Sequence, residues 1–170
     1  MVPHSDEQHL DTAAFDEFVE GLDYPMFVVT TAHDGRRAGC LVGFTTQASI
    51  DPPRMLVCLS VQNRTYRLAR DADVLAVHVL DPAQRDLAEL FGGVSGDDTD
   101  KFARCAWQPG PEAVPLLDGC PRRIVGRILE RVPFGDHVGF LLDPTGIEVR
   151  AGGAGLSYEE VQDLDPGHPA

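Results

Sequence analysis

The stretch GCLVGFTTQASIDPP, residues 39–53, is the part of the sequence that decides the fold. Apolar, aromatic and β-branched residues over 38–46 favour a strand. The stretch ends in Asp51-Pro52-Pro53, and prolines cannot donate hydrogen bonds to a strand ladder. The simplest interpretation is therefore an ordinary buried strand that a proline pair brings to an abrupt end.

Strand patterns continue on both sides of this stretch. Residues 26–32 form a β-rich run that His33-Asp34-Gly35-Arg36 joins to 38–46. An Asp-Gly pair between two such runs indicates a hairpin. Further strands are predicted at residues 54–61, 74–80, 122–132 and 137–143.

The predicted helices are short. Residues 11–20 have amphipathic spacing, so we expect a helix there that packs on a larger body. A second helix is expected at 65–70. A third is expected to begin at Asp81-Pro82, because Asp is a preferred N-cap and Pro a preferred first helical residue, and to end at Gly92. The glycine run at 151–155 is interpreted as a turn that leads into a short helix.

Six or more strands with only short helices between them do not alternate as in a doubly wound sheet. This pattern predicts a mainly β fold, a closed or partly closed barrel with peripheral helices. The chain of 170 residues fits one domain, expected at 10–162. The ends, 1–9 and 163–170, are polar and lack periodicity, which predicts flexible termini.

Charge and composition exclude several classes of function. The chain carries 14 basic and 27 acidic residues, a net charge of −13, which repels nucleic acid and anionic membrane surfaces. No run approaches the roughly 18 apolar residues of a membrane span. Six histidines lack metal-ligand spacing, so no metal site is expected. Four scattered cysteines and the absence of a secretory pattern predict a cytoplasmic protein with reduced thiols.

The stretch at 39–53 also resembles the signature of the flavin reductase family. In that family a glycine opens a strand of small and hydroxyl residues that ends in Ser-x-Asp-Pro-Pro. Arg64-Thr65, Phe91, Lys101-Phe102 and Gly135-Asp136-His137 match further family elements in chain order. The resemblance spans roughly residues 18–150 and implies an FMN-binding split β-barrel with short peripheral α-helices.

The resemblance implies a flavin site along the strand, where small side chains permit close approach of a flat ring and backbone N–H groups can donate to it. The cofactor-binding residues expected in this stretch are Gly43, Thr45, Thr46, Gln47, Ala48 and Ser49. Leu41, Gly43 and His78 depart from the commoner family pattern. His78 shares a strand face with apolar residues, so a hydrogen-bonded core histidine is the favoured interpretation and a ligand contact the alternative.

The remaining site residues are expected outside that stretch. Arg64 and Thr65 would meet the FMN phosphate, with Lys101 and Phe102 beside it. A solvated helix face is the competing interpretation of the arginines. His137 would complete the nicotinamide pocket as the catalytic position, although hydride transfer needs no protein acid or base. An exposed turn histidine is the alternative.

The sequence therefore predicts an NAD(P)H-dependent flavin reductase that binds FMN, or alternatively FAD. A homodimer is expected from the family, and a monooxygenase partner could use the reduced flavin. The competing hypothesis is a split-barrel protein that binds flavin or another cofactor without reductase turnover, because fold alone does not fix function.

Overall fold

The computed structural model describes residues 11–150 and 152–167. The expected flexible segment at 1–9 lies outside the described residues. The elements in chain order are helix α1 (Thr12–Glu20), strands β1 (Phe27–His33), β2 (Arg36–Val42), β3 (Thr45–Ser49) and β4 (Arg54–Ser60), helix α2 (Arg64–Ala69), strand β5 (Val74–Val79), 3-10 turn η1 (Pro82–Gln84), helix α3 (Arg85–Gly92), 3-10 turn η2 (Lys101–Arg104), strand β6 (Trp107–Pro109), 3-10 turn η3 (Pro111–Ala113), and strands β7 (Pro115–Leu117), β8 (Arg122–Pro133) and β9 (His137–Val149).

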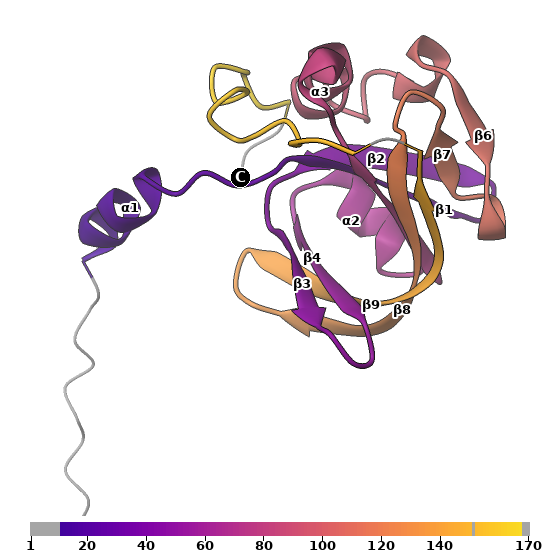
Figure 1. The fold of residues 1–170 in the computed structure, drawn as a ribbon, viewed down its shortest axis with the longest axis horizontal. Coiled ribbons are helices and arrows are strands. Elements are labelled where there is room, and N and C mark those ends of the chain that lie inside the picture. Colours follow the sequence, from indigo (N-terminus) through magenta and orange to yellow (C-terminus); the bar gives the residue numbers. More distant parts are fainter. Residues whose placement is uncertain (1–10, 151, 168–170) are drawn as a thin grey trace, which may run out of the picture.

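Seven strands form one antiparallel sheet in the order β2-β1-β5-β8-β9-β4-β3. The sheet curls round (Figure 1). Its two edge strands, β2 and β3, are consecutive in the chain. A separate pair, β6 and β7, lies at one side. The predicted mainly β class with short peripheral helices is confirmed.

The predicted strand at 38–46 is in fact two strands. The backbone bends at Gly43 and Phe44, where the Thr45 amide donates to the Gly43 carbonyl at 2.8 Å. An added Cβ at Gly43 would lie 2.3 Å from Cε2 of Tyr24, so glycine makes room for the Tyr24 ring. The bend carries the chain from one sheet edge to the other.

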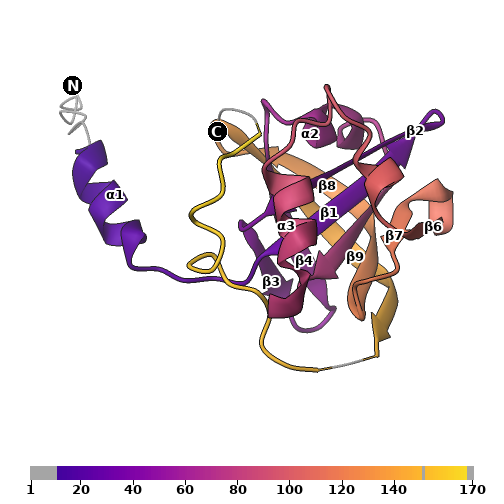
Figure 2. The ribbon, with the colours of Figure 1, turned by 90° about the horizontal axis from the view of Figure 1, so that it is seen from above.

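The hairpin prediction is confirmed, and two predictions about helices are wrong. The hairpin turn has Asp34 and Gly35 at positive φ, as a two-residue turn between twisted strands requires. The helix expected after the glycine run does not form: residues 159–163 are turns, with bonds such as the one from the Val161 amide to the Tyr158 carbonyl at 3.0 Å. Helix α1 forms but buries none of its residues (Figures 1 and 2), so it does not pack on a larger body within this chain.

The C-terminal segment contacts the domain. Asp163 pairs with Arg85 at 2.7 Å, and the Gly167 amide donates to the Gly92 carbonyl at 2.9 Å. These contacts tie residues 163–167 to α3. The expected flexibility of the segment stays a prediction.

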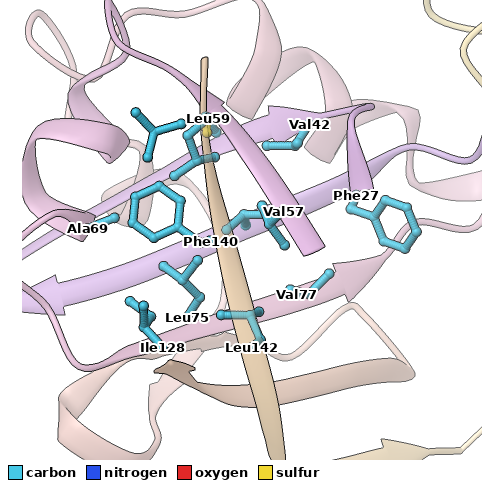
Figure 3. Close-up of a cluster of buried hydrophobic side chains, with 13 residues drawn as sticks. Phe27, Val42, Val57, Leu59, Ala69, Leu75, Val77, Ile128, Phe140 and Leu142 are labelled. Carbon is cyan, nitrogen blue, oxygen red and sulfur yellow. The ribbon is translucent and has the colours of Figure 1, made fainter. Parts of the chain in front are cut away.

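Strand β1 is buried on both faces and thus separates two apolar clusters. Phe27 and Val29 belong to one cluster, with β4, β5 and β9 residues such as Phe140 (Figure 3). Met26 and Val28, on the opposite face, pack against α3 and the C-terminal segment. A continuous apolar run rather than an alternating one is the sequence pattern of such a strand.

His78 of β5 is fully buried and joins three strands. Its Nδ1 lies 3.0 Å from the Val28 carbonyl oxygen, and its Nε2 accepts from the Leu117 amide at 3.1 Å. These partners require a neutral ring that carries its proton on Nδ1. His78 is therefore a core histidine with both ring nitrogens satisfied, the favoured of the two interpretations.

Burial lowers the pKa of His78 to about 4. In the unfolded chain the ring titrates near 6.5, so between pH 6.5 and 4 the unfolded state binds the extra proton and the folded state resists it. We expect the free energy of unfolding to fall, by on the order of 3 kcal/mol, as the pH drops through that window. Urea denaturation at a series of pH values measures this loss.

The matched variant is His78→Gln, whose amide can donate and accept but does not titrate. Its stability should be lower at pH 7, with a flatter dependence between pH 6.5 and 4 than that of the wild type. The same slope in both proteins would contradict the assignment to His78.

Candidate functional site

The described part of the chain contains a cavity of about 380 Å³. Three segments wall it: residues 35–39 at the start of β2, residues 62–65 at the start of α2, and residues 94–102. The cavity brings together Arg64, Thr65, Lys101 and Phe102, which sequence analysis placed in one site from two distant segments.

Local capping positions these side chains at the wall. The Asn63 side chain accepts from the Thr65 amide at 2.8 Å and so fixes the first turn of α2. Asp100 does the same for η2, where its side chain accepts from the Phe102 amide at 3.0 Å. The Asn63 cap therefore orients Arg64 and Thr65, and the Asp100 cap orients Lys101 and Phe102.

Lys101 is a buried cation without a carboxylate partner among the described residues. It is 5% exposed, and its Nζ donates to the carbonyl oxygens of Phe91 at 2.9 Å and Gly39 at 3.3 Å. Burial lowers the pKa of its ammonium group. Because a buried charge is costly unless it is paired, a cavity with this cation in its wall favours an anionic ligand.

Thr65 provides a second buried polar group, one whose hydroxyl lacks a hydrogen bond of normal geometry. Its side chain is 1% exposed, and its Oγ1 makes no hydrogen bond of normal geometry to a described residue, although the weakly bonding Cys40 thiol lies beside it. Buried hydroxyls in folded proteins are normally satisfied. A ligand oxygen in the cavity would supply the missing partner, so Lys101 and Thr65 together fit a phosphate group.

Arginines from two elements, β2 and α2, secure the loop at 94–100 over the cavity. Arg64 donates to the Gly96 carbonyl at 2.8 Å, and Arg37 pairs with Asp100 at 3.2 Å. The Arg37 guanidinium also lies 4.9 Å from the Trp107 ring centroid. Sequence analysis missed this loop and Arg37 as site components. The only sequence signal was the pair of arginines beside the predicted hairpin turn.

The other predicted site residues lie outside the cavity. Gly43 lies in the bend before β3, residues 45–49 form β3, and His137 begins β9. The Phe44 and His137 rings are 5.2 Å apart, so this second group is also clustered. His137 Nδ1 lies 2.8 Å from the Asp136 carboxylate, which lowers the pKa of Asp136.

Strand β4 connects the two groups. Ser60, near its end, pairs with His137 in the sheet, and the Val61 amide donates to the Asp136 carbonyl at 2.9 Å. The next residue, Gln62, lines the cavity. The cavity and the His137 cluster therefore lie at the same end of β4, where one elongated ligand could contact both.

The described residues hold no group of three or more His, Cys, Asp or Glu side chains placed to bind a metal ion. In the same part of the chain, no helix is long and apolar enough to cross a membrane.

Comparison with known proteins identifies the family. The sequence model described as "Flavin reductase like domain" matches residues 19–162, so the chain belongs to this family, as the resemblance predicted. It is 28% identical over 145 residues to FMN reductase (NADH) RutF of Pseudomonas syringae, covering 85% of this chain and 81% of that protein. It is also 28% identical over 154 residues to the 4-hydroxyphenylacetate 3-monooxygenase reductase component of Escherichia coli, covering 90% and 89%.

The fold agrees with that assignment. A flavin reductase domain protein from Arthrobacter sp. FB24 superposes with a TM-score of 0.80 at 19% identity and covers 94% of this chain and 96% of that one. This likeness shows a shared fold.

The Thr65 hydroxyl, which has no hydrogen bond of normal geometry, gives a test of the cavity in the flavin-free protein. Thr65→Val removes a buried hydroxyl that has no normal partner, so the free energy of unfolding should rise by about 1 kcal/mol. The control is Thr30→Val. Thr30 is equally buried, but its hydroxyl donates to the Pro115 carbonyl at 2.6 Å, so this variant should lose about 1 kcal/mol. Chemical denaturation measures both, and equal losses would mean that Thr65 Oγ1 is satisfied by the protein.

Proposed function

We propose that the protein is an NAD(P)H-dependent flavin reductase that binds FMN, with FAD as the alternative flavin. The observation that carries the proposal is the Lys101 ammonium, which is buried in a cavity wall without a carboxylate partner among the described residues. Family membership and the names of the relatives support the same reaction class.

The cavity is proposed to hold the phosphate end of the flavin. Lys101 and Thr65 would contact the phosphate oxygens from the wall, and Arg64 would exchange the Gly96 carbonyl for one of them. Phe102 is 6% exposed and packs between the Phe91 and Trp107 rings, so its role is to hold Lys101 in place. Hydrogen bonds between charged partners are the strong ones, which suits an anchoring role.

The exposed edge of the sheet is proposed to hold the flavin ring. Strand β3 pairs only with β4, so its outer edge presents unpaired backbone groups. The ring-binding residues would be Thr45, Thr46, Gln47, Ala48 and Ser49. The Thr45 hydroxyl is a further buried group without a partner among the described residues. Gly43 acts indirectly, because the space beside it is occupied by Tyr24.

When bound, the flavin supplies the two-electron acceptor for the hydride of the nicotinamide. The chain's own task is to position both ligands. His137 is proposed to orient the nicotinamide: Phe44 packs against its ring and Asp136 bonds its Nδ1, which leaves Nε2 to meet a ligand. A monooxygenase component is the proposed consumer of the reduced flavin, since one relative is a monooxygenase reductase component.

The test is steady-state NADH and NADPH oxidation with added FMN. The wild type should oxidise the nicotinamide only when flavin is present. His137→Ala should lower kcat/KM for the nicotinamide about five- to thirtyfold while FMN affinity changes little, the pattern of a lost orienting contact.

The control for this variant is His33→Ala, at the hairpin outside the cavity lining, which should behave as the wild type. FMN binding without NAD(P)H oxidation in the wild type would favour the competing hypothesis of a flavin-binding protein without turnover. Unchanged kinetics in His137→Ala would remove the role assigned to that residue.

We further propose that the curled sheet is a split β-barrel that forms a homodimer in the cytoplasm. Helix α1 supports the dimer: Phe18 is 72% exposed and Phe15 53% exposed, and no described part of the same chain covers them. On the barrel, Ile50 is 85% exposed and Phe134 59% exposed. Such apolar surface is typical of a contact between copies. The four free cysteines agree with a reducing compartment.

Light scattering at micromolar concentration measures the oligomeric state. The expected mass is twice that of the 18.5 kDa chain, and Phe18→Asp should shift the population to single chains because it places a charge in the contact. A wild type that scatters as a single chain would contradict the dimer.

A further inference from the structure

A second hollow lies beside the cavity and shares part of its wall. It has a volume of about 160 Å³ and is lined by Arg36, Arg64, Arg67, Leu68 and Asp97. Arg36, Arg64 and Asp97 also line the larger cavity, so the two are neighbours. Lys101 and Thr65 line only the larger cavity, which means that the small hollow has its own set of polar groups.

The small hollow is strongly cationic within an acidic protein. Three of the 14 basic residues surround it, against one carboxylate, although the whole chain has a net charge of −13. Arg36 is exposed and makes no ion pair with a described residue. The excess positive charge is therefore local. Salt screens the acidic groups that lie farther away than a Debye length, so an anion near the hollow is attracted by the arginines.

Asp97 already occupies this hollow as an anion. Both of its oxygens accept from Arg67, at 2.6 and 2.8 Å, and Arg64 lies 3.7 Å from the carboxylate. The hydrogen bond from Arg67 lowers the pKa of Asp97, so the carboxylate stays charged at neutral pH. Both bonds come from one guanidinium nitrogen, Arg67 Nη2, so the hollow already binds the oxygens of an anion, and phosphate oxygens are recognised by the same kind of charged donor.

We propose that this hollow is a second phosphate subsite, in which Arg36 and Arg67 bind a phosphate that the larger cavity does not take and Asp97 weakens that binding. The inference rests on the proposed function. Two ligands of the reaction carry such a phosphate: FAD has one more than FMN, and NADPH has a 2′-phosphate that NADH lacks. In one of these pairs, the subsite would make the protein prefer the ligand that carries the additional phosphate.

Calorimetric titration of the full-length protein with FMN, FAD, NADH and NADPH tests the inference, and binding is measured so that the result does not depend on turnover. Arg36→Ala should weaken the binding of FAD relative to FMN, or of NADPH relative to NADH, about tenfold, as expected for one lost charge-assisted contact. Asp97→Asn should shift the same ratio in the opposite direction. The pair whose ratio moves identifies the ligand.

The matched control is Arg70→Ala. Arg70 follows α2, forms its one ion pair among the described residues with the neighbouring Asp71 at 3.2 Å and lies outside both hollows, so both ratios should remain those of the wild type. Unchanged ratios in Arg36→Ala and Asp97→Asn, or equal weakening of all four ligands, would overturn the second subsite. If the ratios shift in the two variants as predicted but the wild type oxidises no nicotinamide, the proposed function is contradicted and the subsite is supported.

Discussion

The buried ammonium group of Lys101 joins the elements that form the candidate site. It comes from η2 and bonds the Gly39 carbonyl of β2 and the Phe91 carbonyl of α3. An added Cβ at Gly39 would lie 2.8 Å from the Phe91 ring, so the close approach of β2 and α3 needs glycine there. Two carbonyl dipoles satisfy part of the charge but cannot neutralise it. The same group that holds β2, α3 and η2 together therefore also creates the demand for an anion.

The sheet places this charge near the surface that would hold the rest of the ligand. Because Gly43 and Phe44 carry the chain directly from edge strand β2 to edge strand β3, both edges and the end of β4 lie within one continuous segment, residues 36–62. The two apolar clusters on either side of β1 keep the sheet rigid behind it. Binding functions are thus confined to loops and one strand edge supported by a packed scaffold.

The sequence predicts the elements well where local chemistry decides them and poorly where distant contacts do. The Asp34-Gly35 turn, the proline stop after Ser49 and the strand at 74–80 follow from turn propensity and apolar runs, and the structure confirms them. The break at Gly43 depends on the Tyr24 ring. Strands β6 and β7 have only three residues each and each includes a proline, so no local period predicts them.

The candidate site shows the same division. Arg64-Thr65 and Lys101-Phe102 could be selected from the family resemblance, and the cavity brings them together. Arg37 and the loop at 94–100 join the site through ion pairs and hydrogen bonds with partners about 30 to 60 residues away, and such contacts leave no pattern in the sequence. The roles assigned to Gly43, to residues 45–49 and to His137 remain proposals.

The most direct test of the account is a crystal structure of the protein with FMN. The account predicts the phosphate in the cavity, within hydrogen-bond distance of Lys101 Nζ and Thr65 Oγ1, and the flavin ring along the outer edge of β3 towards His137. A phosphate bound elsewhere, with Lys101 and Thr65 still facing solvent or protein alone, would contradict the claim that the unpaired buried cation is the flavin anchor.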